Sequence, residues 1–145
     1  MPRVVLWLGI GGLIPFVVLS VSIHFVPMHL APSVLFWLIG YGAVILSFLG
    51  GVVWGLTLNK PVDYPTPPKN IFLTLSVLPS LFSWGVLVVE AKTGLYALII
   101  CFSFMLALDL FSQRLGLSPG WYFDLRKRLT FVVLGCFFIV LIALV

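Results

Sequence analysis

Five long apolar stretches constrain the fold of this chain more than any other sequence feature. They cover residues 4–26, 33–56, 71–89, 94–112 and 129–145, and we expect the fifth helix to begin at about residue 126. A helix that crosses a bilayer needs about 20 mostly apolar residues, with about 17 as the lower limit. No stretch alternates polar and apolar residues as a barrel strand does. The sequence therefore predicts an all-α, polytopic integral membrane protein.

Composition supports the same environment. Hydrophobic residues make up 62% of the 145 residues and charged residues only 8%, whereas soluble domains carry about 25% charged residues. The segments between the apolar stretches are too short to form a soluble domain. We expect one transmembrane domain over residues 1–145, built as a five-helix bundle.

The first apolar stretch could also be interpreted as a signal peptide. Its length exceeds the usual core of about 7–15 residues, and the following "VPMHLAPS" offers no convincing cleavage site. We therefore expect a retained first helix.

Basic residues predict the orientation. Seven of the eight fall on one side of the predicted bundle, and only Lys92 falls on the other; the seven are Arg3, Lys60, Lys69, Arg114, Arg126, Lys127 and Arg128. Loops rich in Lys and Arg stay on the cytoplasmic or matrix side. The N-terminus is thus expected inside and the C-terminus outside. The net charge of +4 comes from this asymmetry and indicates contact with anionic lipid headgroups. No nucleic-acid partner is therefore expected.

Classical catalytic and metal-binding motifs are absent from the sequence. There is no GxSxG, HExxH, Walker loop or Cys/His cluster, and Cys101 and Cys136 have no metal-ligand spacing. His24 and His29 flank the outer end of the first helix and are expected at the interface. We expect a protein that is not an enzyme, with no catalytic residue, no metal and no cofactor.

Small residues mark one side of the second helix. One set of small residues recurs every four positions: Ala43, Ser47, Gly51 and Gly55. The neighbouring surface of the helix has few side chains because it carries Gly40, Gly42 and Gly50. Such stripes let helices approach closely in lipid, so the simpler interpretation is tight packing against this helix. The alternative is a cavity beside the stripe, left by kinks at Pro15 and at Pro79, which Ser80 follows.

Asp109 is the one carboxylate within a predicted span. An ion pair with Arg114, Arg126 or Arg128 would make it a clamp between the fourth and fifth helices, and proton or substrate handling is the alternative. Trp54, Trp121 and Tyr122 reach the same depth, although aromatic residues also populate the membrane interface.

The segment "NKPVDYPTPPKN" joins the second and third helices. Its prolines predict an extended, partly polyproline II loop in solvent.

Several motifs together resemble the transmembrane protein 69 family, also known as domain of unknown function 3429. They are "LIPF", "YGAVILSFLGGVVWG", "SVLPSLFSW", a lone aspartate late in the fourth helix and "GWYFDLRKRLT", in the family's order and across almost the whole chain. The resemblance implies a small multi-span protein of bacterial inner membranes or mitochondria, with no established biochemical role. Relatives often have histidine where this chain has Val53, which argues against metal or haem chemistry there.

Two functional hypotheses follow. The first, slightly favoured, is a non-enzymatic accessory or assembly factor of a larger membrane complex, whose partners are the lipid bilayer and another membrane protein or a second copy. The second is a binding or transport protein for an apolar ligand, such as a lipid, quinone or tetrapyrrole, in an inner-leaflet cleft beside Trp54, Asp109 and Arg126. We expect a bacterial inner membrane, with the mitochondrial inner membrane as alternative. The candidate functional or clamp residues are Tyr41, Ser47, Gly50, Gly51, Trp54, Gly55, Pro79, Ser80, Trp84, Asp109, Trp121, Tyr122 and Arg126.

Overall fold

The computed structural model describes residues 2–61, 63 and 65–144, and within these residues the chain forms five α-helices and no strand. The helices are α1 (Arg3–Ser22), α2 (Ala31–Leu58), α3 (Thr66–Val86), α4 (Ala91–Arg114) and α5 (Gly120–Ala143). The predicted all-α fold is therefore confirmed.

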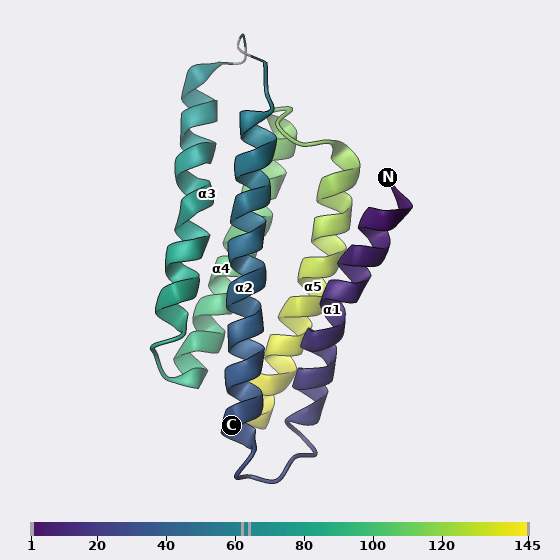
Figure 1. Cartoon of the computed structure of the whole chain (residues 1–145), viewed down its shortest axis with the longest axis vertical. Coiled ribbons are helices and arrows are strands. Elements are labelled where there is room, and N and C mark those ends of the chain that lie inside the picture. The colour runs from purple at the N-terminus through teal and green to yellow at the C-terminus, as the bar shows by residue number, and fades with distance from the viewer. Residues whose placement is uncertain (1, 62, 64, 145) are drawn as a thin grey trace.

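The helices form a two-layer bundle of alternating direction. Helices α3, α2 and α1 lie side by side in one layer, and α4 and α5 form the second layer behind them (Figure 1). Among the described helices, α2 contacts α1, α3 and α4, whereas α1 contacts only α2 and α5. Toward its N-terminus α1 leans away from the rest of the bundle (Figure 1). This tilt matters because it opens space between α1, α2 and α5.

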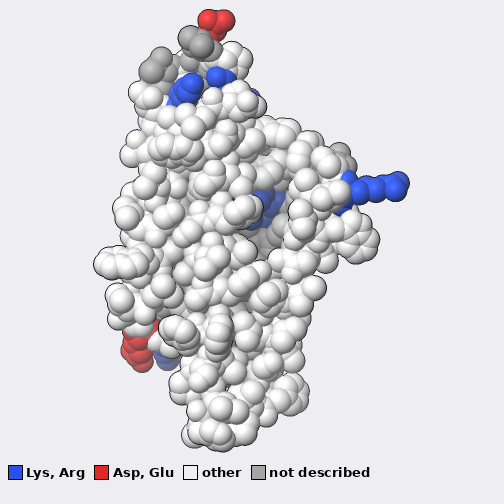
Figure 2. Space-filling view, viewed as in Figure 1, with Lys and Arg blue, Asp and Glu red and all other residues white. Residues whose placement is uncertain are grey.

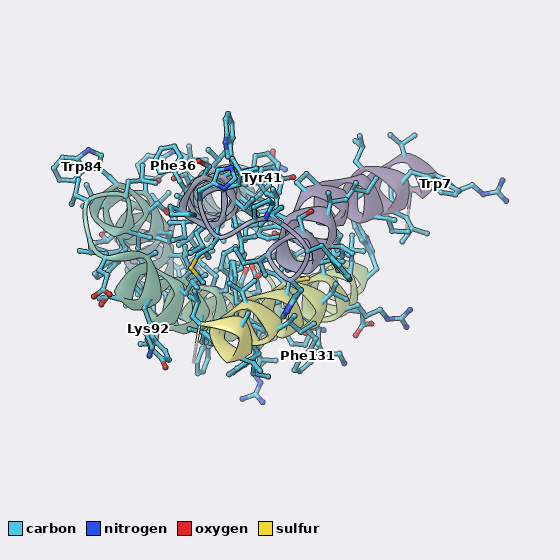
Figure 3. The ribbon with its side chains drawn as sticks, turned by 90° about the horizontal axis from the view of Figure 1, so that it is seen from below. Trp7, Phe36, Tyr41, Trp84, Lys92 and Phe131 are labelled. Atoms are coloured by element: carbon cyan, nitrogen blue, oxygen red, sulfur yellow. The ribbon has the colours of Figure 1, made fainter. Side chains whose placement is uncertain are left out.

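The outer surface of the bundle suits a lipid environment. Figure 3 shows Trp7, Phe36, Trp84 and Phe131 projecting away from the bundle, and each is more than 60% exposed. Helices α1, α2 and α4 are long and apolar enough to span a membrane. Exposed large apolar side chains are costly in water but normal against lipid tails. The chain is thus a membrane protein.

All five helices begin earlier than the sequence analysis predicted, α3 and α5 by the most, and α1 and α3 also end earlier. Helix α3 starts at Thr66, so the prediction of an extended loop up to Asn70 is wrong. Prolines occupy the first turn of α3, where a missing amide donor costs nothing. Helix α5 starts at Gly120, directly after Pro119, and α1 ends at Ser22 rather than at Val26. Both α1 and α3 continue as helices through Pro15 and Pro79.

Aromatic rings fill the centre of the core. Phe16 of α1, Phe102 of α4 and Phe137 of α5 are each at most 1% exposed. Their ring centroids lie 5.7–6.1 Å apart in edge-to-face geometry, the arrangement that the ring quadrupoles favour. These rings join three helices at one level.

The predicted small-residue stripe is not a single packing face. Ala43 is buried, Ser47 is half-buried, and Gly51 and Gly55 are exposed with open space around their Cα atoms. Four residues turn an α-helix by about 400°, so positions spaced by four drift around its surface. The close approach is instead at Gly50, whose Cα faces the Ser76 carbonyl of α3 so tightly that a Cβ would overlap it.

Charged residues gather at the ends of the bundle. Figure 2 shows blue and red side chains near the α2–α3 connection and a smaller charged group near the start of α4; the broad surface between them on this face is uncharged apart from blue atoms at its right edge and in a hollow. Basic residues at the first end include Lys60, Lys69 and Arg114, whereas Glu90 and Lys92 lie at the other end. The two ends therefore differ in charge as the sequence analysis predicted.

Candidate functional site

A cavity of about 510 Å³ lies between α1, α2 and α5, with one residue of α4 at its inner wall. Figure 2 shows the hollow on this face, with blue atoms of a basic side chain inside it. The lining residues are Val5, Leu8, Gly9, Gly12, Leu13 and Phe16 of α1; Ile45, Phe48, Leu49 and Val52 of α2; Phe102 of α4; and Tyr122, Leu125, Arg126, Leu129, Thr130 and Val133 of α5.

The cavity is an elongated groove between α1 and α5. Its lining positions on α1 and on α5 recur three and four residues apart, so each set forms one face of its helix. Each face runs over eleven residue steps, about 16 Å at the helical rise. Gly9 and Gly12 contribute no side chain to the α1 face, and a Cβ on Gly9 would lie only 3.0 Å from Leu129. Gly9 thus lets α1 approach Leu129 of α5 closely, and Gly12 leaves its part of the wall without a side chain.

One end of the groove is aromatic and closed. Phe16 and Phe102 belong to both the cavity wall and the central aromatic cluster. Tyr41 lies 4.9 Å from Phe16, centroid to centroid, and its hydroxyl donates a 3.0 Å hydrogen bond to the Gly12 carbonyl. Figure 3 shows Tyr41 among the side chains between α2 and α1. This bond ties α1 to α2 beside the cavity.

The other end holds a buried ion pair. Arg126 Nε donates to Asp109 Oδ2 over 2.9 Å, and the two side chains are 7% and 1% exposed, respectively. Arg126 lines the cavity, whereas Asp109 lies behind it on α4. A guanidinium keeps its proton under all ordinary conditions, so the nearby carboxylate supplies its counter-charge.

A Schellman turn sets the register of this pair. Helix α4 ends at Arg114, and Gly116 follows with a φ of 68°, which glycine adopts without strain. The Leu117 amide donates to the Ser112 carbonyl at 2.8 Å, and the Gly116 amide donates to the Gln113 carbonyl at 3.0 Å. Lys60 of the α2 end donates to the Gly116 carbonyl at 2.6 Å. The short turn brings the first turns of α5 back against the last turns of α4.

Polar atoms without partners lie along the α5 wall of the cavity, from Tyr122 to Thr130. Within the described part of the chain, Arg126 Nη2, Thr130 Oγ1 and the Tyr122 hydroxyl are buried and make no hydrogen bond of acceptable geometry. Tyr122 and Arg126 nevertheless face each other in a side-chain hydrogen-bonding contact of poorer geometry, and Asp109 lies near both. An unsatisfied buried polar atom costs about 1–3 kcal/mol, so such atoms beside one cavity require an explanation. All three residues line the cavity.

The predicted site residues fall into separate places. The structure brings together Asp109, Tyr122 and Arg126, and of the three arginines considered for Asp109 it selects Arg126. Trp54 does not line this cavity, so the predicted cleft beside Trp54 and Arg126 is wrong in that part. Trp54 borders a second, open groove with Leu73, Thr74, Val77 and Leu78 of α3.

The remaining predicted residues lie outside the cavity. Pro79 is buried against Gly50, and Tyr41 bonds α1 beside the cavity. The others are exposed or half-buried: Ser47, Gly51, Gly55, Ser80, Trp84 and Trp121. The cavity forms at the glycine-bearing face of α1 because α1 is the helix that leans outward, while α3 packs closely on α2.

Thr130 was missed in the sequence analysis. It is 1% exposed and lies four residues after Arg126 and eight after Tyr122, on the same face of α5. That spacing was the available signal, because polar residues at i, i+4 and i+8 share a helix face. The face is hard to recognise in "WYFDLRKRLT" because three exposed charged residues lie between its members: Asp124, Lys127 and Arg128.

The arrangement is suited to binding rather than to a recognisable reaction. Ligand pockets typically measure about 300–1,000 Å³ and combine apolar walls with a few polar groups, as this cavity does. Among the described residues no group of three His, Cys, Asp or Glu side chains is close enough to hold a metal ion.

Comparison with known proteins gives a family but no activity. A family described as "Protein of unknown function (DUF3429)" matches residues 1–142. A Xenopus tropicalis protein named Transmembrane protein 69 is 36% identical over 131 residues, covering 90% of this chain and 51% of the relative. The Mus musculus protein of the same name is 33% identical over 143 residues, covering 97% and 56%. The chain thus spans about half the length of these curated relatives. No solved structure matches it.

Proposed function

We propose that this chain, which belongs to the DUF3429 family of membrane proteins, binds a single amphipathic lipid-like molecule in the cavity between α1, α2 and α5. The observation that carries the proposal is the combination of one elongated, mostly apolar cavity with unpaired buried polar atoms along its α5 wall. An acyl or prenyl chain would occupy the apolar length, and its polar group would meet Arg126, with Tyr122 one turn before it on α5 and Thr130 one turn after it.

The proposal places all five helices across the membrane, with the N-terminus inside and the C-terminus outside. Seven basic residues at the α2–α3 end of the bundle support this orientation under the positive-inside rule. The ion-pair end of the cavity then lies in the inner leaflet, where a lipid could enter sideways past α1. The membrane we propose is the bacterial inner membrane, with the mitochondrial inner membrane as alternative.

We propose that the protein is not an enzyme. The polar end of the cavity offers one ion pair and two hydroxyls, without a nucleophile activated by a neighbouring base in the described residues. The groups at this end can bind and orient a molecule, and binding or transport is therefore the role that we propose.

Native mass spectrometry of the protein, extracted gently from its own membrane, tests this function. Wild-type protein is expected to carry one co-purified small molecule. Gly12→Leu is expected to lose it, because a leucine at Gly12 extends into the cavity. Gly11→Leu is the matched control, since the neighbouring Gly11 is exposed with open space around it. Equal occupancy in the two variants, or an empty wild type, would overturn the proposal.

A second candidate function has its own observation. Gly51 and Gly55 leave an exposed, thinned surface on α2 beside Trp54, and lipid-embedded helices associate through such surfaces. An accessory or assembly factor would dock a partner helix there. Gly51→Leu would then release a stoichiometric protein partner from the extracted complex while leaving the cavity ligand in place; retention of the partner would count against this role.

A further inference from the structure

We infer that the cavity selects an uncharged amphipath with a hydrogen-bond-accepting oxygen, and that Asp109 enforces this selection by neutralising Arg126. The inference rests on the proposed function and names the chemical class of its ligand. The observation that carries the inference is that Arg126, a cation at the cavity wall, already forms an ion pair with Asp109, which lies outside the cavity on α4.

The first step is the charge of the polar end. Arg126 and Asp109 are both almost fully buried and lie 2.9 Å apart, so together they carry no net charge. The other charged residues of α5, namely Asp124, Lys127 and Arg128, are exposed. Exposed charges are screened by solvent and ions over about 10 Å at ordinary salt concentrations. The ligand therefore meets an environment that is locally neutral and of low polarity.

The second step is the set of hydrogen-bonding groups. Arg126 Nη2 can only donate, and the hydroxyls of Tyr122 and Thr130 can donate or accept. These atoms are enclosed by neighbouring side chains, so the Arg126 and Thr130 side chains would have to rotate to bring them to a ligand oxygen. An ester, ketone or quinone oxygen would accept from these groups. A pure hydrocarbon would leave them unpaired.

The third step is the cost of an anion. A ligand carboxylate at Arg126 would share one guanidinium with Asp109 and leave one uncompensated negative charge inside the bundle. Buried charges without a partner are strongly disfavoured, and like charges close together repel. Asp109 therefore acts against anionic lipids, although Arg126 alone would attract them.

A matched ligand series tests the inference. The protein is placed in nanodiscs of neutral lipid, and equilibrium binding of tritiated methyl dodecanoate, dodecanoic acid and dodecane is measured at neutral pH. Nanodiscs that hold Gly12→Leu protein give the background for partition into the bilayer. We expect the methyl ester to bind at least about tenfold more tightly than either the acid or the alkane, which is the affinity change expected from one hydrogen bond to a charged donor.

The variant Asp109→Asn is expected to reverse the preference. Asparagine keeps the size of the side chain but removes its charge, so Arg126 becomes an uncompensated cation. The acid should then gain at least about tenfold relative to the ester. If Asp109→Asn does not fold, the relative binding of the three ligands by wild-type protein tests the inference by itself.

The outcomes separate the inference from the proposed function. Equal or tighter binding of the acid by wild-type protein would overturn the inference while leaving a ligand-binding cavity. Binding of dodecane as tight as that of the ester would show a chain site that does not recognise the headgroup, and would also overturn it. Binding of none of the three above background would count against the proposed function, and the inference would fall with it.

Discussion

Arg126 Nε lies 2.9 Å from Asp109 Oδ2, and this contact joins the first turns of α5 to the last turns of α4 at the edge of a cavity. The pair is single-pronged: in the part of the chain that the structure describes, Asp109 Oδ1 and Arg126 Nη2 have no hydrogen-bond partner. It therefore clamps two helices and leaves the Nη2 group of Arg126, a residue of the cavity wall, without a hydrogen bond of good geometry. The two roles predicted for Asp109, a clamp and a part of a ligand site, are compatible in this geometry.

Removing one member of this pair should destabilise the bundle strongly. We expect Asp109→Ala to lower the free energy of unfolding in mixed micelles by about 3–5 kcal/mol, because it leaves a buried guanidinium without a counter-charge. Asp124→Ala breaks an exposed pair with Lys127 at 3.8 Å and should cost no more than about 1 kcal/mol. Equal effects of the two substitutions would contradict the clamp.

Replacing both partners should separate stability from binding. The double variant Asp109→Leu with Arg126→Met is expected to regain most of the stability lost in Asp109→Ala, because apolar pairs can substitute for buried ion pairs. The co-purified molecule should still be lost, since the donor at Arg126 is gone. Retention of the ligand by the double variant would show that the ion pair is structural alone.

Thr130→Val should stabilise the protein while weakening ligand binding. Valine has nearly the shape of threonine, and the Thr130 hydroxyl is buried with no partner within the described residues. Removing such an atom is expected to raise the free energy of unfolding by about 1 kcal/mol. Native mass spectrometry should show lower occupancy of the ligand. A loss of stability would contradict our assignment of this hydroxyl to the ligand.

The close approach of α2 and α3 depends on Gly50. A methyl group at this position would overlap the Ser76 carbonyl, so Gly50→Ala is expected to lower the free energy of unfolding by about 1–3 kcal/mol. Gly51→Ala is the matched control, because the space beside Gly51 is open, and it should change stability by no more than about 0.5 kcal/mol. Similar costs for the two variants would contradict the packing.

Orientation can be tested by cysteine labelling in bacterial spheroplasts. With Cys101 and Cys136 replaced by alanine, a single cysteine is introduced at Asp63 or at Glu90, which lie at opposite ends of the bundle. A membrane-impermeant maleimide is expected to label Glu90→Cys in intact spheroplasts and Asp63→Cys only after permeabilisation. Labelling in the opposite order would reverse the proposed topology.

The all-helical fold was predictable because lipid leaves few alternatives for long apolar segments. The start of α3 was not predicted, since prolines were read as extended chain although the first helical turn also accepts them. The sequence analysis left three arginines as possible ion-pair partners of Asp109. The choice of Arg126 depends on the turn at Gly116, whose conformation sets how α5 returns against α4.

The position of the cavity was the part that the sequence could not define. Helix α1 is apolar on every side, so its sequence does not mark the face that packs or the direction in which it leans. The cavity results from that tilt. The candidate site therefore lies in the groove between α1 and α5 and not beside Trp54 of α2. Thr130 could have been found from its spacing, because it shares a helix face with Arg126.

Photo-crosslinking in the native membrane tests the central claim most directly. A diazirine amino acid is placed at Leu13, which lines the cavity, or at Ile14, which is 60% exposed on the outside of α1. After irradiation, intact-protein mass spectrometry reports what has become attached. We predict one discrete adduct mass at Leu13 and a spread of bulk-lipid masses at Ile14. The same bulk-lipid spread at both positions would contradict a specific ligand in the cavity.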